Sequence, residues 1–174
     1  MEWKEAIKII LLGEITMQSA ANHKKTGACH VLIVLQIFLG IGAFFGGLLL
    51  VLAPDGSLLH MPLYLLRTSI FHSYLIPGII LCLVLGVYPL VIAWFLISEK
   101  PFAAAEGLNL YKKTHWAWNH SLYAGFILII WLTVEMYEIQ AVALVHLFYM
   151  FLALAILAVT LLPSVKNHYA RLAQ

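Results

Sequence analysis

Two ionisable side chains, Glu135 and His146, lie inside otherwise apolar stretches of the sequence. An unpaired ionisable group at the centre of a membrane costs roughly 3 kcal/mol or more, which makes each of them a candidate for function. A short segment, residues 138–140, separates the two stretches. If both stretches are helices, the chain reverses there and brings Glu135 and His146 to the same depth. We therefore predict that this carboxylate and this imidazole form a pair.

Other polar and aromatic side chains belong to the same side of the predicted bundle and extend this pair into a candidate site. Imidazole and carboxylate groups bind zinc, copper or iron, and they also carry protons. The predicted ligand-binding residues are Glu135, His146, His72, His60, Trp131 and Tyr74. The alternative is that the Glu135–His146 pair is purely structural and that His60 and His72 are hydrated residues of the membrane interface.

The histidines also allow a second arrangement, in which they face one another in pairs on different helices. His30 and His120 lie near one side of the predicted bundle, and His72 and His146 lie near the opposite side. Two imidazoles at matched depth can ligate a b-type haem, so two such pairs would hold two haems across the bilayer. Haem b or a transition metal is therefore an alternative cofactor, although no local motif singles one out.

The elements that must carry these residues are four long apolar runs. Each run is near or above the roughly 20 residues that an α-helix needs to cross the hydrocarbon core. Since a backbone in lipid must satisfy its own hydrogen bonds, runs of this length form helices. The chain of 174 residues is 63% hydrophobic and only 10% charged, which agrees with this class. The predicted spans are residues 28–53, 69–97, 118–137 and 141–162.

The sequence thus predicts an all-α, polytopic membrane protein built on a four-helix transmembrane domain, residues 28–163. Residues 1–27 carry Trp3 and Ile7 one helical turn apart, with charged residues on other faces. This pattern is typical of an amphipathic helix on a membrane surface. The alternative is that this helix packs against the bundle or against a partner subunit. Residues 164–174 are predicted to form a short cytoplasmic tail.

Positive charge is distributed unevenly over the segments that connect the spans. Of the ten Lys and Arg residues, only Arg67 lies in a connection between spans one and two or between spans three and four. The others are Lys4, Lys8, Lys24, Lys25, Lys100, Lys112, Lys113, Lys166 and Arg171. Cytoplasmic segments carry the excess of Lys and Arg, so both termini and the middle loop are predicted to be cytoplasmic. No cluster among these cations is large enough to indicate nucleic-acid binding.

Small and turn-forming residues in the first two spans indicate how the helices pack and end. Gly42 and Gly46 form a GxxxG spacing, which permits close packing inside the chain or in a dimer. Pro77 and Pro89 are expected to bend or loosen the second span. The connection Leu58–Leu66 is too apolar for an ordinary solvated loop and too short to span. We expect it to lie in the membrane interface or to cover the end of the bundle.

Turn, aromatic and acidic positions in the central part of the chain form one further pattern. It consists of Pro54-Asp55-Gly56, Pro62, Phe71, Leu75-Ile76-Pro77-Gly78, Trp131 and Glu135. The stretch of roughly residues 40–162 that contains it resembles a large group of small, uncharacterised four-helix bacterial membrane proteins. The resemblance implies a bundle in the bacterial cytoplasmic (inner) membrane, and it implies no activity or ligand. The histidines and the N-terminal amphipathic helix lie outside what it implies.

The predicted function follows from the apolar bundle and from the motifs that the sequence lacks. It contains no nucleophile-elbow, HExxH, phosphate-loop, CxxC or dinucleotide-binding motif. We predict a non-enzymatic integral membrane protein that is an accessory subunit of a membrane complex or binds a lipid or quinone-like molecule in the outer half, beneath Leu58–Leu66. The alternatives are a haem- or metal-binding electron-transfer protein and a small oligomeric transporter. Expected partners are membrane lipids and either further copies of the chain or a larger membrane complex.

Overall fold

The computed structural model describes residues 25–67 and 69–172, and the regular structure within these residues is entirely helical. The elements are α2 (Gly27–Leu52), η1 (Ser57–Leu59), η2 (Leu63–Leu66), α3 (Leu75–Ile80), η3 (Leu81–Val87), α4 (Tyr88–Ser98), α5 (Ala103–Glu106), α6 (Trp116–Ile139), α7 (Leu144–Leu161) and α8 (Pro163–Arg171). The predicted amphipathic helix of residues 1–27 falls, up to residue 24, outside the described residues.

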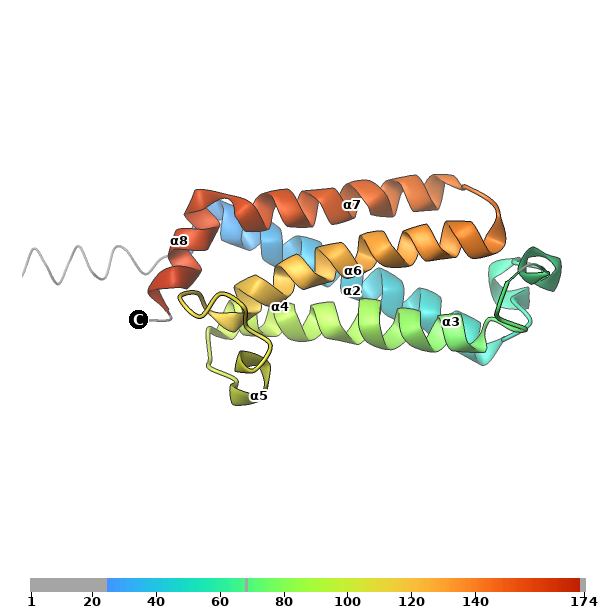
Figure 1. Cartoon of the computed structure of the whole chain (residues 1–174), viewed down its shortest axis with the longest axis horizontal. Coiled ribbons are helices and arrows are strands. Elements are labelled where there is room, and N and C mark those ends of the chain that lie inside the picture. Colours follow the sequence, from blue (N-terminus) through green and yellow to red (C-terminus); the bar gives the residue numbers. More distant parts are fainter. Residues whose placement is uncertain (1–24, 68, 173–174) are drawn as a thin grey trace, which may run out of the picture.

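Four long helices run along the length of the molecule and form a bundle (Figure 1). They are α2, the continuous stack of α3, η3 and α4, and then α6 and α7, and each is long and apolar enough to cross a membrane. This confirms the predicted four-helix architecture. The connections that contain residues 53–74 and 140–143 lie at one end of the bundle, which we call the loop end. Helices α5 and α8 lie at the opposite end, the α8 end.

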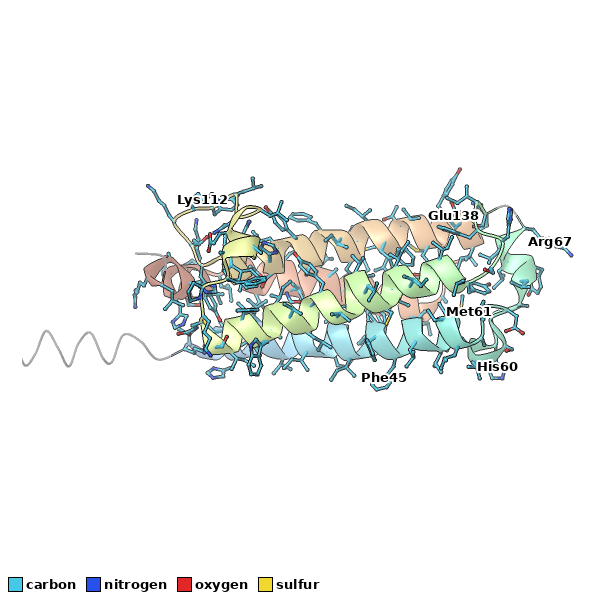
Figure 2. All side chains as sticks on the ribbon, turned by 90° about the horizontal axis from the view of Figure 1, so that it is seen from below. Phe45, His60, Met61, Arg67, Lys112 and Glu138 are labelled. Atoms are coloured by element: carbon cyan, nitrogen blue, oxygen red, sulfur yellow. The ribbon has the colours of Figure 1, made fainter. Side chains whose placement is uncertain are left out.

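The outside of the bundle is as apolar as its core. Phe45, Ile130 and Phe151 are 58, 63 and 64% exposed although they lie well within their helices, and Phe45 points away from the bundle (Figure 2). Charged side chains lie near the ends, with Lys112 at the α8 end and Arg67 at the loop end (Figure 2). Water-soluble proteins do not expose an apolar belt of this extent. The surface is therefore the one expected of helices that face lipid.

The second span begins at Leu75, later than the predicted residue 69, because Pro77 lies in its first turn. The backbone N–H that proline lacks has no partner in the first turn of a helix, so proline is tolerated there. Pro77 therefore helps to begin the helix, which corrects the expectation that it bends the span. Residues 69–74 belong to the connection at the loop end.

Pro89 is accommodated by a change of helix type. The seven residues before Tyr88, Leu81–Val87, form the π-helix η3, and the N–H of Tyr88 bonds to the carbonyl of Leu83, five residues back. In a regular α-helix the proline ring would clash with the carbonyl four residues before it. The wider π-turn relieves this clash, and such turns are frequent at functional sites. The expectation that Pro89 loosens the helix is thus confirmed.

Glycines let α2 and the second span approach so closely that their backbones touch. A Cβ built on Gly86 would lie 2.8 Å from the Cα of Phe44, and one on Gly47 would lie 2.6 Å from the carbonyl oxygen of Gly78. Lipid provides no hydrophobic force between helices, so this close packing is a main source of their association. Of the predicted GxxxG pair, Gly42 packs inside the chain against the Tyr149 side chain of α7, whereas the close contact with the second span is made by Gly47 and not by Gly46. The dimer alternative stays a prediction.

We expect Gly47→Ala to destabilise the protein by about 1–3 kcal/mol, because the added methyl meets backbone atoms that cannot rotate away. The adjacent Gly46→Ala is the matched control, since its Cβ would lie 3.6 Å from Leu81 Cδ2, an ordinary contact. Unfolding of both variants in mixed micelles, followed by circular dichroism, measures the difference. Equal stability of the two variants would contradict the packing described here.

The C-terminal segment, predicted as a tail from residue 164, forms the helix α8 and packs against the end of the bundle. Val165 and Tyr169 are fully buried there. The Tyr169 hydroxyl donates to the Leu96 carbonyl at 3.0 Å, and the Tyr169 carbonyl accepts from the His115 N–H at 2.9 Å. Helix α8 thus joins the end of α4 to the beginning of α6.

A carboxylate, Glu99, holds three further segments together at the α8 end. It follows α4 and accepts from His168 Nε2 of α8 at 2.9 Å, and Lys25, just before α2, pairs with the same oxygen at 3.1 Å. Partial burial alone would raise the pKa of Glu99, but the bonds from His168 and Lys25 outweigh it and hold the pKa below its ordinary value of 4.5. Its stabilising contribution is present above the ordinary pKa and is lost as the pH falls through the lowered one.

Candidate functional site

The structure brings Glu135 of α6 and His146 of α7 together near the loop end. His146 Nε2 lies 3.8 Å from Glu135 Oε1, which is within reach of an ion pair and longer than a direct hydrogen bond. His146 Nδ1 accepts the Ala143 N–H at 2.9 Å. Because an accepting nitrogen carries no proton, the proton of the neutral ring lies on Nε2 and faces the carboxylate. The short connection between α6 and α7 therefore has the geometric effect expected from the sequence.

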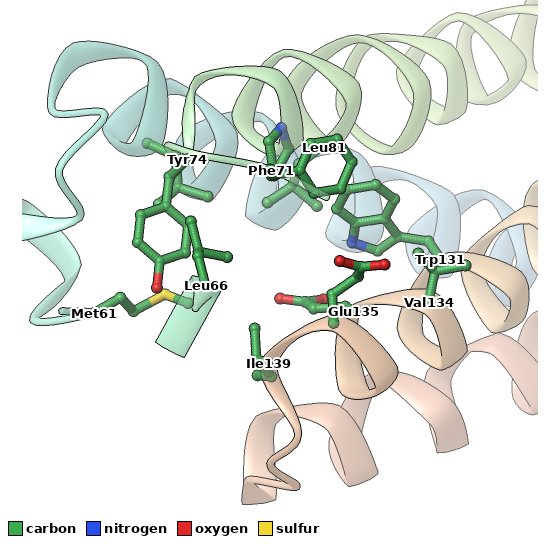
Figure 3. A pocket seen from close by; sticks show the side chains of 12 residues that line it. Met61, Leu66, Phe71, Tyr74, Leu81, Trp131, Val134, Glu135 and Ile139 are labelled. Atoms are coloured by element: carbon green, nitrogen blue, oxygen red, sulfur yellow. The ribbon is translucent and has the colours of Figure 1, made fainter. Parts of the chain in front are cut away.

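Glu135 also lies in the wall of a small cavity at the loop end, together with Trp131 and Tyr74 (Figure 3). The indole nitrogen of Trp131 points toward the Glu135 carboxylate (Figure 3). His60 and His72 do not line this cavity and are exposed. Of the six predicted ligand-binding residues, the structure thus gathers Glu135, Trp131 and Tyr74 in one wall, with His146 beside Glu135.

The connection between α2 and α3 covers this cavity with part of its apolar surface. Leu66 is buried against Tyr74 and Met61, and the Tyr74 hydroxyl donates to the Pro62 carbonyl at 3.2 Å. Tyr64 on the same segment is 61% exposed. The segment therefore covers the end of the bundle with one side and presents its other side outward, and its placement in the membrane interface stays a prediction.

The cavity beneath this segment has a volume of about 30 Å³. That is room for about one water molecule, whereas sites for drug-sized molecules occupy roughly 300–1,000 Å³. Glu135 in its wall, with His146 beside it, is suited to hold a water or a proton. A lipid or quinone requires a larger space.

The observed bonding of the histidines does not fit a pair of haem-binding sites. Both ring nitrogens of His120 are engaged, one with the Tyr88 hydroxyl at 2.9 Å and one with the Ala105 carbonyl at 3.3 Å. His30 is exposed and its Nδ1 contacts the Thr26 carbonyl of its own helix. Within residues 25–67 and 69–172, no three His, Cys, Asp or Glu side chains gather as metal ligands. Haem or metal stays a prediction that an absorbance spectrum and metal analysis decide.

We expect the Glu135–His146 pair to be energetically coupled, because leaving either group alone in an apolar surrounding costs free energy. Glu135→Met and His146→Leu should each destabilise the protein, and the double variant should lose about 1 kcal/mol less than the sum of the two. Thr133→Val combined with His146→Leu is the control for additivity, since Thr133 bonds only to its own helix, to the Ile129 carbonyl. Additive losses in the Glu135–His146 cycle would show that the two groups do not interact.

A larger space lies on the outside of the bundle, where the second span and α6 diverge. This groove has a volume of about 590 Å³ and opens on the surface of the bundle. Its walls are apolar, and three polar side chains line its end nearest the α8 end: Tyr88, His120 and Tyr123. The other lining residues are Leu83, Val84, Leu108, Phe126 and Ile127. Two of these, Leu83 and Val84, belong to the π-helix η3.

The three polar side chains of the groove are held in two separate sets of hydrogen bonds. The Tyr88 hydroxyl meets His120 Nδ1 at 2.9 Å. The Tyr123 hydroxyl donates to the Leu108 carbonyl at 2.9 Å and accepts from Asn119 Nδ2 at 2.9 Å. Rigid polar groups at one end of an apolar groove are what fixes the head of an amphipathic molecule.

Sequence reasoning identified His120 but did not identify this groove. In the sequence, Tyr88 and Tyr123 resemble the other aromatic residues of apolar helices. A π-helix cannot be recognised reliably from a single sequence. One signal was present: Asn119, His120 and Tyr123 fall within five consecutive residues of one span, which marks a polar patch on α6.

Comparison of the chain with protein-family models, with curated proteins and with solved structures finds no match.

Proposed function

We propose that this chain is a non-enzymatic integral protein of the bacterial cytoplasmic membrane that binds a lipid-like molecule. The single observation that carries the proposal is the groove between η3 and α6, about 590 Å³ in volume with polar groups at one end. This volume is within the range of small-molecule sites, roughly 300–1,000 Å³. The cavity at the loop end, where the sequence suggested the ligand, is about 30 Å³. We therefore propose that the ligand binds in the groove and not at the loop end.

Both the shape and the surroundings of the groove support an amphipathic ligand. Leu83 and Phe126 on its walls are 55 and 54% exposed, so an apolar chain lying between them would cover apolar side chains. At the polar end, Tyr88, His120 and Tyr123 would lie next to the head of the ligand. Lipid binding is compatible with a role as an accessory subunit of a membrane complex, because a small bundle that holds a lipid can present it to a partner protein.

The proposed orientation has the α8 end in the cytoplasm. Lys25, Lys100, Lys112 and Lys166 all belong to this end, whereas Arg67 lies at the loop end. We expect a membrane-impermeant thiol reagent added to intact cells to modify a cysteine placed at position 57 and to leave one at position 106 unmodified. Cells made permeable are the control, in which both positions must react. The reverse pattern in intact cells would overturn the orientation.

Filling the groove should prevent binding. Val84→Trp places an indole in the groove, while Val87→Trp on the same π-helix lies outside it. The two valines are 38 and 37% exposed, so the two positions are matched in exposure. We expect a photoactivatable long-chain alcohol to modify peptides containing Leu83 or Phe126 in the unmodified protein and in Val87→Trp, and not in Val84→Trp. Equal modification of the two variants would refute the groove as the binding site.

A further inference from the structure

The hydrogen bonds at the polar end of the groove determine which head group it can bind. The Ala105 carbonyl can only accept, so the His120 Nε2 that contacts it at 3.3 Å carries a proton. In the neutral ring, Nδ1 is then an acceptor, and the Tyr88 hydroxyl donates its proton to it at 2.9 Å. The hydrogens of both side chains are therefore engaged inside the protein. What Tyr88 still offers to the groove is a lone pair on its oxygen.

The hydroxyl hydrogen of Tyr123, the other phenol of the groove, is also engaged inside the protein. The Tyr123 hydroxyl donates to the Leu108 carbonyl, which can only accept, and its oxygen accepts one hydrogen from Asn119 Nδ2. A further lone pair is left on the oxygen and no hydrogen. The remaining lining side chains are hydrocarbon. The groove thus presents hydrogen-bond acceptors to a ligand, and the donors of its lining side chains are already used.

From this arrangement we infer that the ligand is a neutral amphiphile with a hydroxyl head, such as a long-chain alcohol or a quinol. A hydroxyl can donate its one hydrogen to a free lone pair of Tyr88 or of Tyr123, whereas a carbonyl, ether or carboxylate head would place only lone pairs against them. A desolvated acceptor without a donor is unfavourable, so the groove discriminates against these heads. This inference rests on the proposed function and specifies the chemical class of its ligand.

The test compares two probes whose head oxygen carries either a hydrogen or a methyl group. Photoactivatable hexadecanol and its methyl ether, with the same diazirine in the tail, are added to the protein in phosphatidylcholine nanodiscs at pH 8, where imidazoles are neutral. Modified peptides from the groove are counted by mass spectrometry. We expect the alcohol to modify them about fivefold more than the ether, the effect of one hydrogen bond. Equal or stronger modification by the ether would overturn the hydroxyl preference while leaving the groove as a binding site. Absence of modification by both probes would overturn the proposed function as well.

A variant at His120 is expected to change Tyr88 from a hydrogen-bond acceptor to a donor toward the ligand while the groove stays open. His120→Leu removes the acceptor of the Tyr88 hydroxyl, which then becomes a free donor toward the groove. The ether should now bind nearly as well as the alcohol. Tyr149→Phe is the control, because this phenol lies on α7 away from the groove and the preference for alcohol should persist. An unchanged preference in His120→Leu would show that the hydrogen-bond arrangement does not select the head group.

Discussion

The bundle depends on the contact between the backbones of α2 and the second span. Helices in lipid gain nothing from burying apolar surface, since the tails are as apolar as leucine, and close packing must supply the association. Gly47 and Gly78 allow this at the loop end, and Gly86 allows it farther along, against Phe44. No larger residue fits at these positions without moving a helix. The position of the second span, including its π-helix, is therefore fixed by α2.

The groove results from the same contact, because α2 holds the second span away from α6. Element η3 contacts α2 extensively and α6 only slightly, so the second span is held against one neighbour and diverges from the other. Near the α8 end the gap is bridged by polar contacts, among them the bond between Tyr88 and His120. Toward the middle, apolar residues such as Leu83 and Phe126 stand apart. Tight packing on one face of the second span thus leaves a groove on its other face.

The sequence predicted the helices well because membrane spans follow from length and apolar composition, which do not depend on tertiary contacts. It also predicted the proximity of Glu135 and His146, because a short connection fixes the register of a hairpin. It failed where the outcome depends on packing between helices. The groove at Tyr88 and Tyr123 results from the divergence of two spans, and the small volume beside Glu135 results from how Leu66 and its neighbours fill the loop end. The docking of α8 through Tyr169 also required tertiary information, because residues 164–174 alone read as a polar tail.

The groove lies along the side of the bundle, between the exposed residues Leu83 and Phe126 of two helices that could cross a membrane. A ligand would enter it from the surrounding hydrocarbon without passing the covered loop end. Its occupancy would then follow the mole fraction of the ligand in the bilayer, and the concentration in water would matter only through partitioning. Exchange would proceed by lateral diffusion in two dimensions, so no segment of the protein would need to open for a molecule to enter or leave. A protein that bound such a ligand would respond to the composition of its membrane, because a change in lipid content would change the occupancy of the groove.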